Sequence, residues 1–166
     1  MDLISESARL DKVMEDVYMS WCAQLNDLDA SIRELSDMLA STEKTDLSEN
    51  ATYTILRDER DVKVSSKIIL VDKVNAYTSE RDTYQPTGVI KLGSTILLDV
   101  VSVDGVPSHR SFPPFKLVID DLSSGVQGLL SIESKVGSSC VGLHANDTFE
   151  VQVPTGTVIY RVKEVY

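Results

Sequence analysis

Residues 46–51 read Asp-Leu-Ser-Glu-Asn-Ala and form a short acidic stretch between two long segments with helical periodicity. Two helices joined by so short a connection run antiparallel to each other. The stretch therefore predicts a helical hairpin that carries carboxylates at its end. Such an arm can bring acidic groups into a site that a globular surface does not reach.

The segment before this stretch has apolar residues at alternating steps of three and four. They are Leu10, Met14, Val17, Trp21, Leu25, Leu28, Ile32, Leu35 and Leu39. This spacing is typical of a coiled-coil seam and predicts a helix that ends near residues 41–42.

The segment after the stretch predicts a second helix over about residues 47–75. Its seam is expected at Ile55, Val62 and Ile69, which recur every seven residues, with Ala51, Val74 and Ala76 near the same stripe. Thirty helical residues extend about 45 Å. A rod with one buried stripe per helix suits an arm better than an enclosed active site.

The second half of the chain has a different composition. All eight glycines and all five prolines follow residue 84. Strand-like runs occupy residues 95–103, 116–120, 129–132, 148–153 and 157–165, and the last two form a hairpin around residues 154–156. About 80 residues can hold one small β core. The predicted fold class is therefore α+β, with an antiparallel coiled-coil hairpin over residues 1–80 and a small β-rich domain over residues 84–166.

Charge and cysteine content narrow the possible functions. Residues 1–80 hold 17 acidic and 9 basic side chains and carry most of the net charge of −10. This balance argues against binding to naked nucleic acid, although a nucleic-acid enzyme remains possible as a protein partner. Cys22 and Cys140 are far apart and suit two free thiols. The sequence shows no signal-peptide pattern and no membrane-spanning apolar run, so we expect a cytoplasmic protein.

Two interpretations of the acidic stretch remain open. Asp46 is a preferred helix N-cap residue, and Glu49 three residues later completes a capping box. Carboxylates at an extremity also suit Mg²⁺, which needs only one or two of them when other ligands come from elsewhere. Two residues cannot form a complete metal site, but they can complete one whose remaining ligands belong to a partner.

Residues 45–53, Thr-Asp-Leu-Ser-Glu-Asn-Ala-Thr-Tyr, closely resemble the D-L-x-E-N-A-x-Y tip motif of bacterial Gre transcript-cleavage factors. The resemblance continues at residues 92–95, 130–142 and 153–166, in the family's order and spacing. It covers essentially the whole chain.

This resemblance implies a function. Gre factors bind DNA-dependent RNA polymerase through an FKBP-like globular domain and insert the hairpin into the secondary channel. Their tip acids help to hold a second Mg²⁺ and promote hydrolysis of backtracked RNA. On this interpretation Asp46 and Glu49 are the catalytic and metal-binding residues, and the Mg²⁺ is shared with the polymerase. Ser48, Asn50 and Tyr53 are the tip contacts, and the RNA 3′ end is met only within the polymerase complex.

The resemblance also implies that the chain is not an enzyme by itself and that residues 134–137 dock on the polymerase. These residues are Ser134, Lys135, Val136 and Gly137. The family's proline is missing here, and the hairpin is more acidic than expected for an arm that meets RNA. These departures favour a divergent member, leave a phage or mobile-element origin open, and keep an alternative function as a channel-binding polymerase inhibitor. We expect a monomer.

Other chemistry finds little support in the sequence. His109 and His144 lack partners at a metal-binding spacing and are interpreted as loop residues. Ser138, Ser139 and Cys140 near His144 do not form a catalytic-triad signature, and no phosphate-binding glycine loop is present. The sequence does not identify an aromatic-lined proline pocket.

Overall fold

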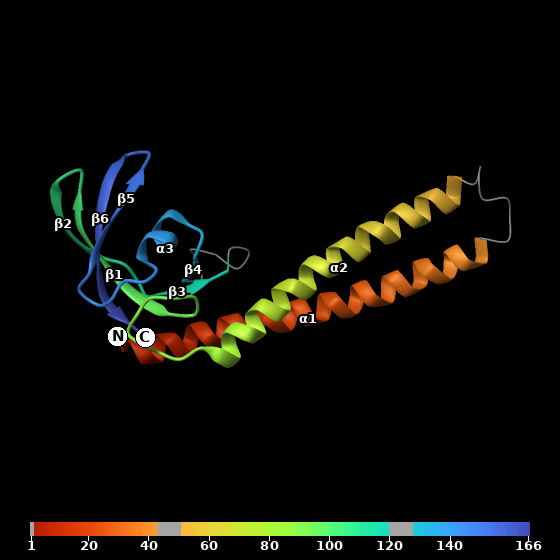
Figure 1. The fold of residues 1–166 in the computed structure, drawn as a ribbon, viewed down its shortest axis with the longest axis horizontal. Coiled ribbons are helices and arrows are strands. Elements are labelled where there is room, and N and C mark those ends of the chain that lie inside the picture. Colours follow the sequence, from red (N-terminus) through yellow and green to blue (C-terminus); the bar gives the residue numbers. More distant parts are fainter. Residues whose placement is uncertain (1, 43–50, 120–127) are drawn as a thin grey trace. The chain divides into compact units, whose positions relative to one another are not determined.

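The computed structural model describes residues 2–42, 51–119 and 128–166 (Figure 1). Two long helices come first, α1 (Leu3–Thr42) and α2 (Ala51–Thr83). The described residues continue with β1 (Thr95–Val103), β2 (Val106–Ser111), β3 (Phe115–Val118), β4 (Leu129–Ser131), α3 (Lys135–Cys140), β5 (Thr148–Val153) and β6 (Gly156–Val165). The predicted α+β class, with a helical hairpin followed by a β-rich part, is confirmed.

The chain forms two compact units. One is Glu15–Ser79, which we call the hairpin unit. The other, the β-rich unit, combines Met1–Met14 with Glu80–Tyr166. The expected division at residues 80–84 into independent domains stays a prediction, because compactness alone does not show which segment folds by itself.

Within the hairpin unit, α1 and α2 pack antiparallel (Figure 1). The rings of Tyr18 and Tyr77 lie 5.5 Å apart, and Lys67 Nζ lies 2.5 Å from Asp29 Oδ1. The predicted α1 seam is confirmed, because each of its residues within this unit is buried or half-buried. Trp21, Leu35 and Leu39 are the most deeply buried.

The predicted α2 seam is wrong. Ile55, Val62 and Ile69 are 65%, 66% and 58% exposed, so this stripe faces away from α1. The packed face of α2 instead contains buried Leu70 and Tyr77. Other positions on this packed face are charged side chains whose aliphatic parts are half-buried, as at Lys67. A search for a repeat of apolar residues therefore does not detect this face.

The α2 helix also continues past the predicted end near Asn75 to Thr83. Tyr77 is buried and its ring packs against that of Tyr18 at a tilt of 43°, which stabilises this additional length. The hydroxyl of Thr78 donates to the Val74 carbonyl, so its hydrogen bond is made within the helix.

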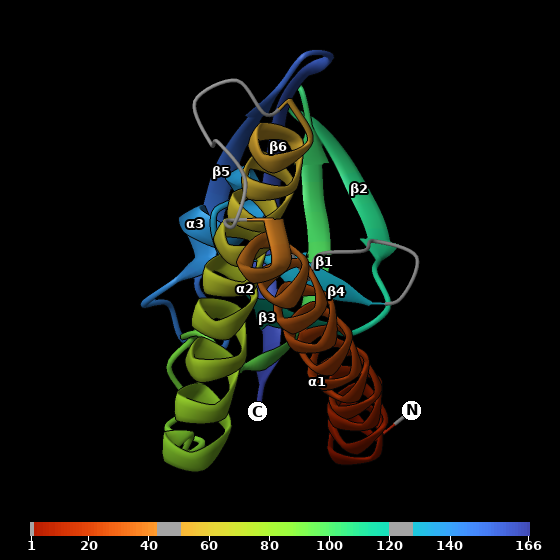
Figure 2. The same ribbon diagram turned by 90° about the vertical axis from the view of Figure 1, so that its right-hand side faces the viewer.

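The sheet of the β-rich unit has the strand order β4-β3-β1-β6-β5, with β2 paired to β1. Only the β3–β4 pair is parallel among these pairs. Figures 1 and 2 show β2, β1, β6 and β5 as neighbouring strands. The five predicted strands are present, and the last two form the predicted hairpin. The strand β2 and the helix α3 were not predicted.

Alternation along these strands supplies the core. Ile96, Leu98 and Val100 of β1 are buried, and Val162 of β6 and Leu117 of β3 join them. A turn at residues 104–105 connects β1 to β2. Asp104 and Gly105 both have positive φ there, at 50° and 77°, a conformation that aspartate tolerates and glycine adopts without strain.

The first turns of α1 are part of the β-rich unit. Leu10 and Met14 are almost completely buried. The Thr95 hydroxyl donates to Ser7 Oγ at 2.9 Å, and Lys116 Nζ lies 2.7 Å from Asp11 Oδ1. The β core therefore depends on residues from the far N-terminal end of the sequence.

A bilayer-spanning helix would need a long run with high mean hydropathy and few charges. Neither α1 nor α2 provides such a run, and no other helix of the described ranges does.

Candidate functional site

The predicted site at the hairpin end falls between the described helix ends. Helix α1 ends at Thr42 and α2 begins at Ala51. Asp46, Ser48, Glu49 and Asn50 lie outside the described residues, and their roles stay predictions. Chain connectivity alone places their segment between these two helix ends.

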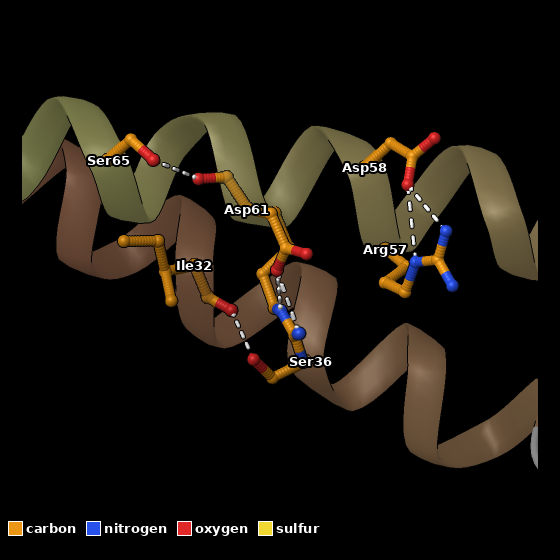
Figure 3. Close-up of polar contacts among 7 residues, drawn as sticks. Ile32, Ser36, Arg57, Asp58, Asp61 and Ser65 are labelled. Carbon is orange, nitrogen blue, oxygen red and sulfur yellow. Dashed lines mark hydrogen bonds and ion pairs between the residues drawn. The ribbon is translucent and has the colours of Figure 1, made fainter.

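Tyr53 is the one predicted tip contact that the structure describes. It lies in the first turn of α2 and is half-buried. Two arginines follow it on α2. Arg57 donates to Asp58 Oδ1 at 3.0 Å and Arg60 donates to Asp61 Oδ1 at 2.9 Å (Figure 3). Asp58 also raises the pKa of the Arg57 guanidinium.

The charge of α1 disfavours direct binding to RNA. Between Lys12 and Arg33 this helix has no basic residue. The same stretch holds Glu15, Asp16, Asp27 and Asp29, of which Asp29 pairs with Lys67. A phosphate backbone is repelled by such a surface. This stretch of α1 is thus poorly suited to binding a nucleic acid.

Metal-binding residues do not cluster within the described ranges, where no group of three or more His, Cys, Asp or Glu side chains is placed to hold an ion. Asp46 and Glu49 supply hard oxygen donors, which fit Mg²⁺ chemically. Two carboxylates leave most of its six coordination positions to water or to a partner.

The predicted docking residues 134–137 form the turn into α3. Ser134 is its N-cap, accepting from the Gly137 amide at 3.0 Å and donating to the Ser131 carbonyl at 2.7 Å. A Cβ on Gly137 would lie 2.0 Å from that same carbonyl oxygen, so only glycine fits. Ser134 and Gly137 therefore shape the first turn of α3. Exposed Lys135 donates from Nζ to the Gln152 carbonyl at 3.3 Å, and Val136 is half-buried.

An apolar pocket of about 230 Å³ lies beside α3. Its lining is Leu98, Phe112, Phe115, Leu130, Val136 and Tyr160. Ring centroids of Phe112 and Tyr160 are 6.2 Å apart, and the Arg110 guanidinium lies 5.2 Å from the Phe112 centroid. Such a pocket suits an apolar side chain offered by a partner. The sequence did not reveal it, because its lining comes from separate strands, a linker and α3.

A polar cluster inside the β-rich unit surrounds buried Lys116. The ammonium donates to the Gly93 carbonyl at 2.8 Å and pairs with Asp11. Burial raises the pKa of nearby Glu80 to about 7, with Lys116 opposing this rise and Asp11 adding to it. The cluster joins α1, the end of α2 and the sheet.

The raised pKa predicts that stability falls with pH. Glu80 binds its proton more tightly in the folded chain, so the free energy of unfolding decreases between about pH 4.5 and 7. We expect the free energy of unfolding of Glu80→Gln to be about 1–2 kcal/mol higher than that of the parent chain at pH 8, after allowance for partial exposure. Near pH 4 the two free energies of unfolding should be equal. Urea unfolding across this pH range measures the difference. Exposed Glu133→Gln is the control, and a pH-independent effect of Glu80→Gln would contradict the prediction.

The contacts of Cys140 and His144 are those of residues that support the fold. Burial raises the pKa of Cys140 to about 11, and its thiol donates to the Gly137 carbonyl at 3.1 Å. The His144 amide donates to Asp147 Oδ2 at 2.7 Å within a loop. Cys140 is therefore a poor nucleophile. His144 lies in a loop as predicted, whereas the loop prediction for His109 is wrong, because this residue lies in β2.

The family model described as "Transcription elongation factor, GreA/GreB, C-term" matches residues 85–166. Among similar proteins, transcription elongation factor GreA of Chloroherpeton thalassium is 25% identical over 145 residues, covering 86% of this chain and 87% of the relative. GreA of Pseudomonas putida is 29% identical over 122 residues, 72% of each chain. GreA of Thermotoga petrophila is 23% identical over 157 residues, covering 95% and 90%.

Two solved structures are also similar. Gfh1 of Thermus aquaticus aligns with a TM-score of 0.40 at 17% identity, covering 90% of this chain and 93% of that one. The elongation factor GreA/GreB of Nitrosomonas europaea aligns with a TM-score of 0.39 at 28% identity, covering 51% and 64%.

Proposed function

The chain belongs to the GreA/GreB family of transcription elongation factors, and from this premise we propose that it stimulates cleavage of backtracked RNA by RNA polymerase. The hairpin enters the secondary channel of the polymerase, and the chain is no enzyme by itself. The observation that carries this proposal is the intact Asp-Leu-Ser-Glu-Asn-Ala-Thr-Tyr sequence at residues 46–53, whose last three residues begin α2 of the antiparallel helical hairpin.

In this proposal Asp46 and Glu49 hold a Mg²⁺ ion together with ligands of the polymerase. When bound, the ion lowers the pKa of a coordinated water and so favours its attack on a phosphodiester. The two carboxylates are presented on a narrow arm, and their helix-capping role is compatible with this task. One oxygen of a carboxylate can accept from a backbone amide while the other faces the metal.

The β-rich unit is the docking part in this proposal. Lys135 and Val136 are among its predicted docking residues, and Val136 lines the apolar pocket. In this proposal an apolar side chain of the polymerase enters the pocket beside Val136. Docking here leaves the acidic hairpin free to provide the chemistry.

Shortening Val136 should weaken docking. We expect Val136→Ala to lower affinity for RNA polymerase about three- to tenfold, because it removes part of the apolar pocket wall. Fluorescence anisotropy of the labelled chain with the core polymerase measures the affinity. Val141→Ala is the matched control, since Val141 is exposed just beyond α3 and does not line the pocket. Equal losses in both variants would argue against docking at this pocket.

Inhibition of the polymerase is the second candidate, favoured by the strongly acidic α1. Carboxylates in the channel could hold the ion unproductively or obstruct an incoming nucleotide. A paired assay decides: RNA cleavage in backtracked complexes and nucleotide addition in active ones, each over a Mg²⁺ titration. Cleavage that rises with Mg²⁺ supports the first function. Suppressed nucleotide addition without cleavage supports the second.

A further inference from the structure

The outer face of α2 carries an apolar stripe made of Ile55, Val62 and Ile69. These side chains are among the most exposed large apolar groups of the described residues. At seven-residue spacing they lie about 10.5 Å apart along the helix and within about 40° of one another around it. Isolated exposed apolar residues are common, but a regular row of three β-branched ones is the pattern of a helix–helix contact.

The stripe is symmetric about its centre. Ile55 and Ile69 are each seven residues from Val62. If a second copy of α2 is laid antiparallel on the stripe, Val62 meets Val62, and Ile55 of each copy meets Ile69 of the other. A surface that matches itself in this way satisfies the requirement for a two-fold contact between identical chains.

The flanking residues favour the antiparallel arrangement. Asp58 and Glu59 border the stripe on one side of Val62, and Ser65 and Ser66 border it on the other. In an antiparallel pair the acids of one copy fall opposite the serines of the second. In a parallel pair each acid would face its own counterpart, and like charges at that distance repel.

The serines also permit close approach. Their side chains are small, and their hydroxyls already donate within the helix. Ser65 Oγ donates to the Asp61 carbonyl at 2.9 Å (Figure 3), and Ser66 Oγ donates to the Val62 carbonyl at 3.0 Å. Burying these two hydroxyls in a contact therefore leaves no hydrogen-bond donor unsatisfied. Asp58 keeps its hydrogen bonds from Arg57 beside the contact.

We propose that this stripe is a self-association site, at which two copies of the chain pair antiparallel through α2 about a two-fold axis at Val62. The contact is narrow compared with the roughly 1,200–2,000 Å² of stable interfaces, so it forms reversibly and at high concentration. The chain is a monomer at low micromolar concentration and pairs at about 100 µM or above. This inference does not depend on the proposed function.

Sedimentation velocity of the full chain between 10 µM and 1 mM tests the association. Ile69→Lys should weaken it at least about tenfold, because a charge then enters the apolar contact. Ile68→Lys is the matched control: Ile68 is the adjacent residue, is also 58% exposed, and lies about 100° away around the helix. It should change the association less than about twofold.

Cysteine cross-linking in a Cys22→Ser background tests the geometry. A disulfide requires Cα atoms within about 7 Å. Val62→Cys should therefore cross-link to itself, whereas Ile55→Cys and Ile69→Cys should cross-link when mixed and much less when separate. Several results would overturn the proposal: a monomer at every concentration, equal losses in the two lysine variants, self-linking of Ile55→Cys as strong as the mixed reaction, or an Ile69→Lys defect confined to polymerase binding.

Discussion

Asp46→Asn and Glu49→Gln are each expected to reduce polymerase-dependent RNA cleavage by at least about a hundredfold while leaving polymerase binding within about twofold. Each amide keeps the shape of the carboxylate but removes the negative charge that a divalent cation requires. Single-turnover cleavage of a defined backtracked complex measures the chemistry, and competition binding measures the docking.

Two controls separate metal binding from helix capping. Asn is itself a good N-cap residue, so Asp46→Asn should leave the thermal unfolding of the hairpin nearly unchanged. Glu43→Gln removes an acid three residues before the motif and should retain most of the cleavage. Full cleavage by both motif variants would refute the metal role, and loss of hairpin stability in step with activity would assign the acids to capping.

Leu10→Ala is expected to destabilise the β-rich unit by about 3 kcal/mol, the largest folding effect that we predict. Leu10 is fully buried, and its Cδ2 would lie 3.0 Å from a Cβ on Gly128, so it packs closely against the start of β4. A cavity at this position cannot be filled by solvent without exposing core side chains.

The measurement must resolve the two units, because a two-unit chain need not unfold in one step. Trp21, the only tryptophan, lies in the hairpin unit and its fluorescence follows that unit. Hydrogen exchange of β1 and β6 amides follows the β-rich unit. Leu10→Ala should accelerate exchange in these strands, whereas exposed Ile4→Ala on the same helix should change stability by less than about 0.5 kcal/mol. Equal exchange rates in both variants would contradict the packing role of Leu10.

Parts of the fold could be predicted because local patterns and tertiary packing agree. The α1 seam repeats over many turns, and β5 and β6 alternate around a Pro-Thr-Gly turn. The α2 seam could not be predicted in the same way. A seven-residue repeat shows that a stripe exists but not which neighbour covers it, and the stripe at Val62 is exposed. The strand β2 was missed because it is mostly exposed and contains Pro107.

The candidate site also has parts that depend on a local sequence pattern and parts that depend on tertiary packing. The tip acids are proposed from a contiguous motif, and their role stays a prediction because they lie outside the described residues. The pocket beside α3 could not be predicted, since Leu98, Phe112 and Tyr160 come together only when the sheet forms. The burial of Leu10 in the β-rich unit could not be predicted either, because periodicity identifies an apolar face without identifying the element that packs on it.

The position of β6 has a consequence for how the chain matures on the ribosome. This strand is synthesised after every other strand of the sheet, yet it lies between β1 and β5. The amide of Thr95 at the start of β1 donates to the carbonyl of Tyr166 at 2.7 Å. The sheet thus remains incomplete until β6 has left the exit tunnel, whereas all residues of the hairpin unit are synthesised earlier. Until then, the core that buries Leu10 and Met14 in the folded chain is incomplete.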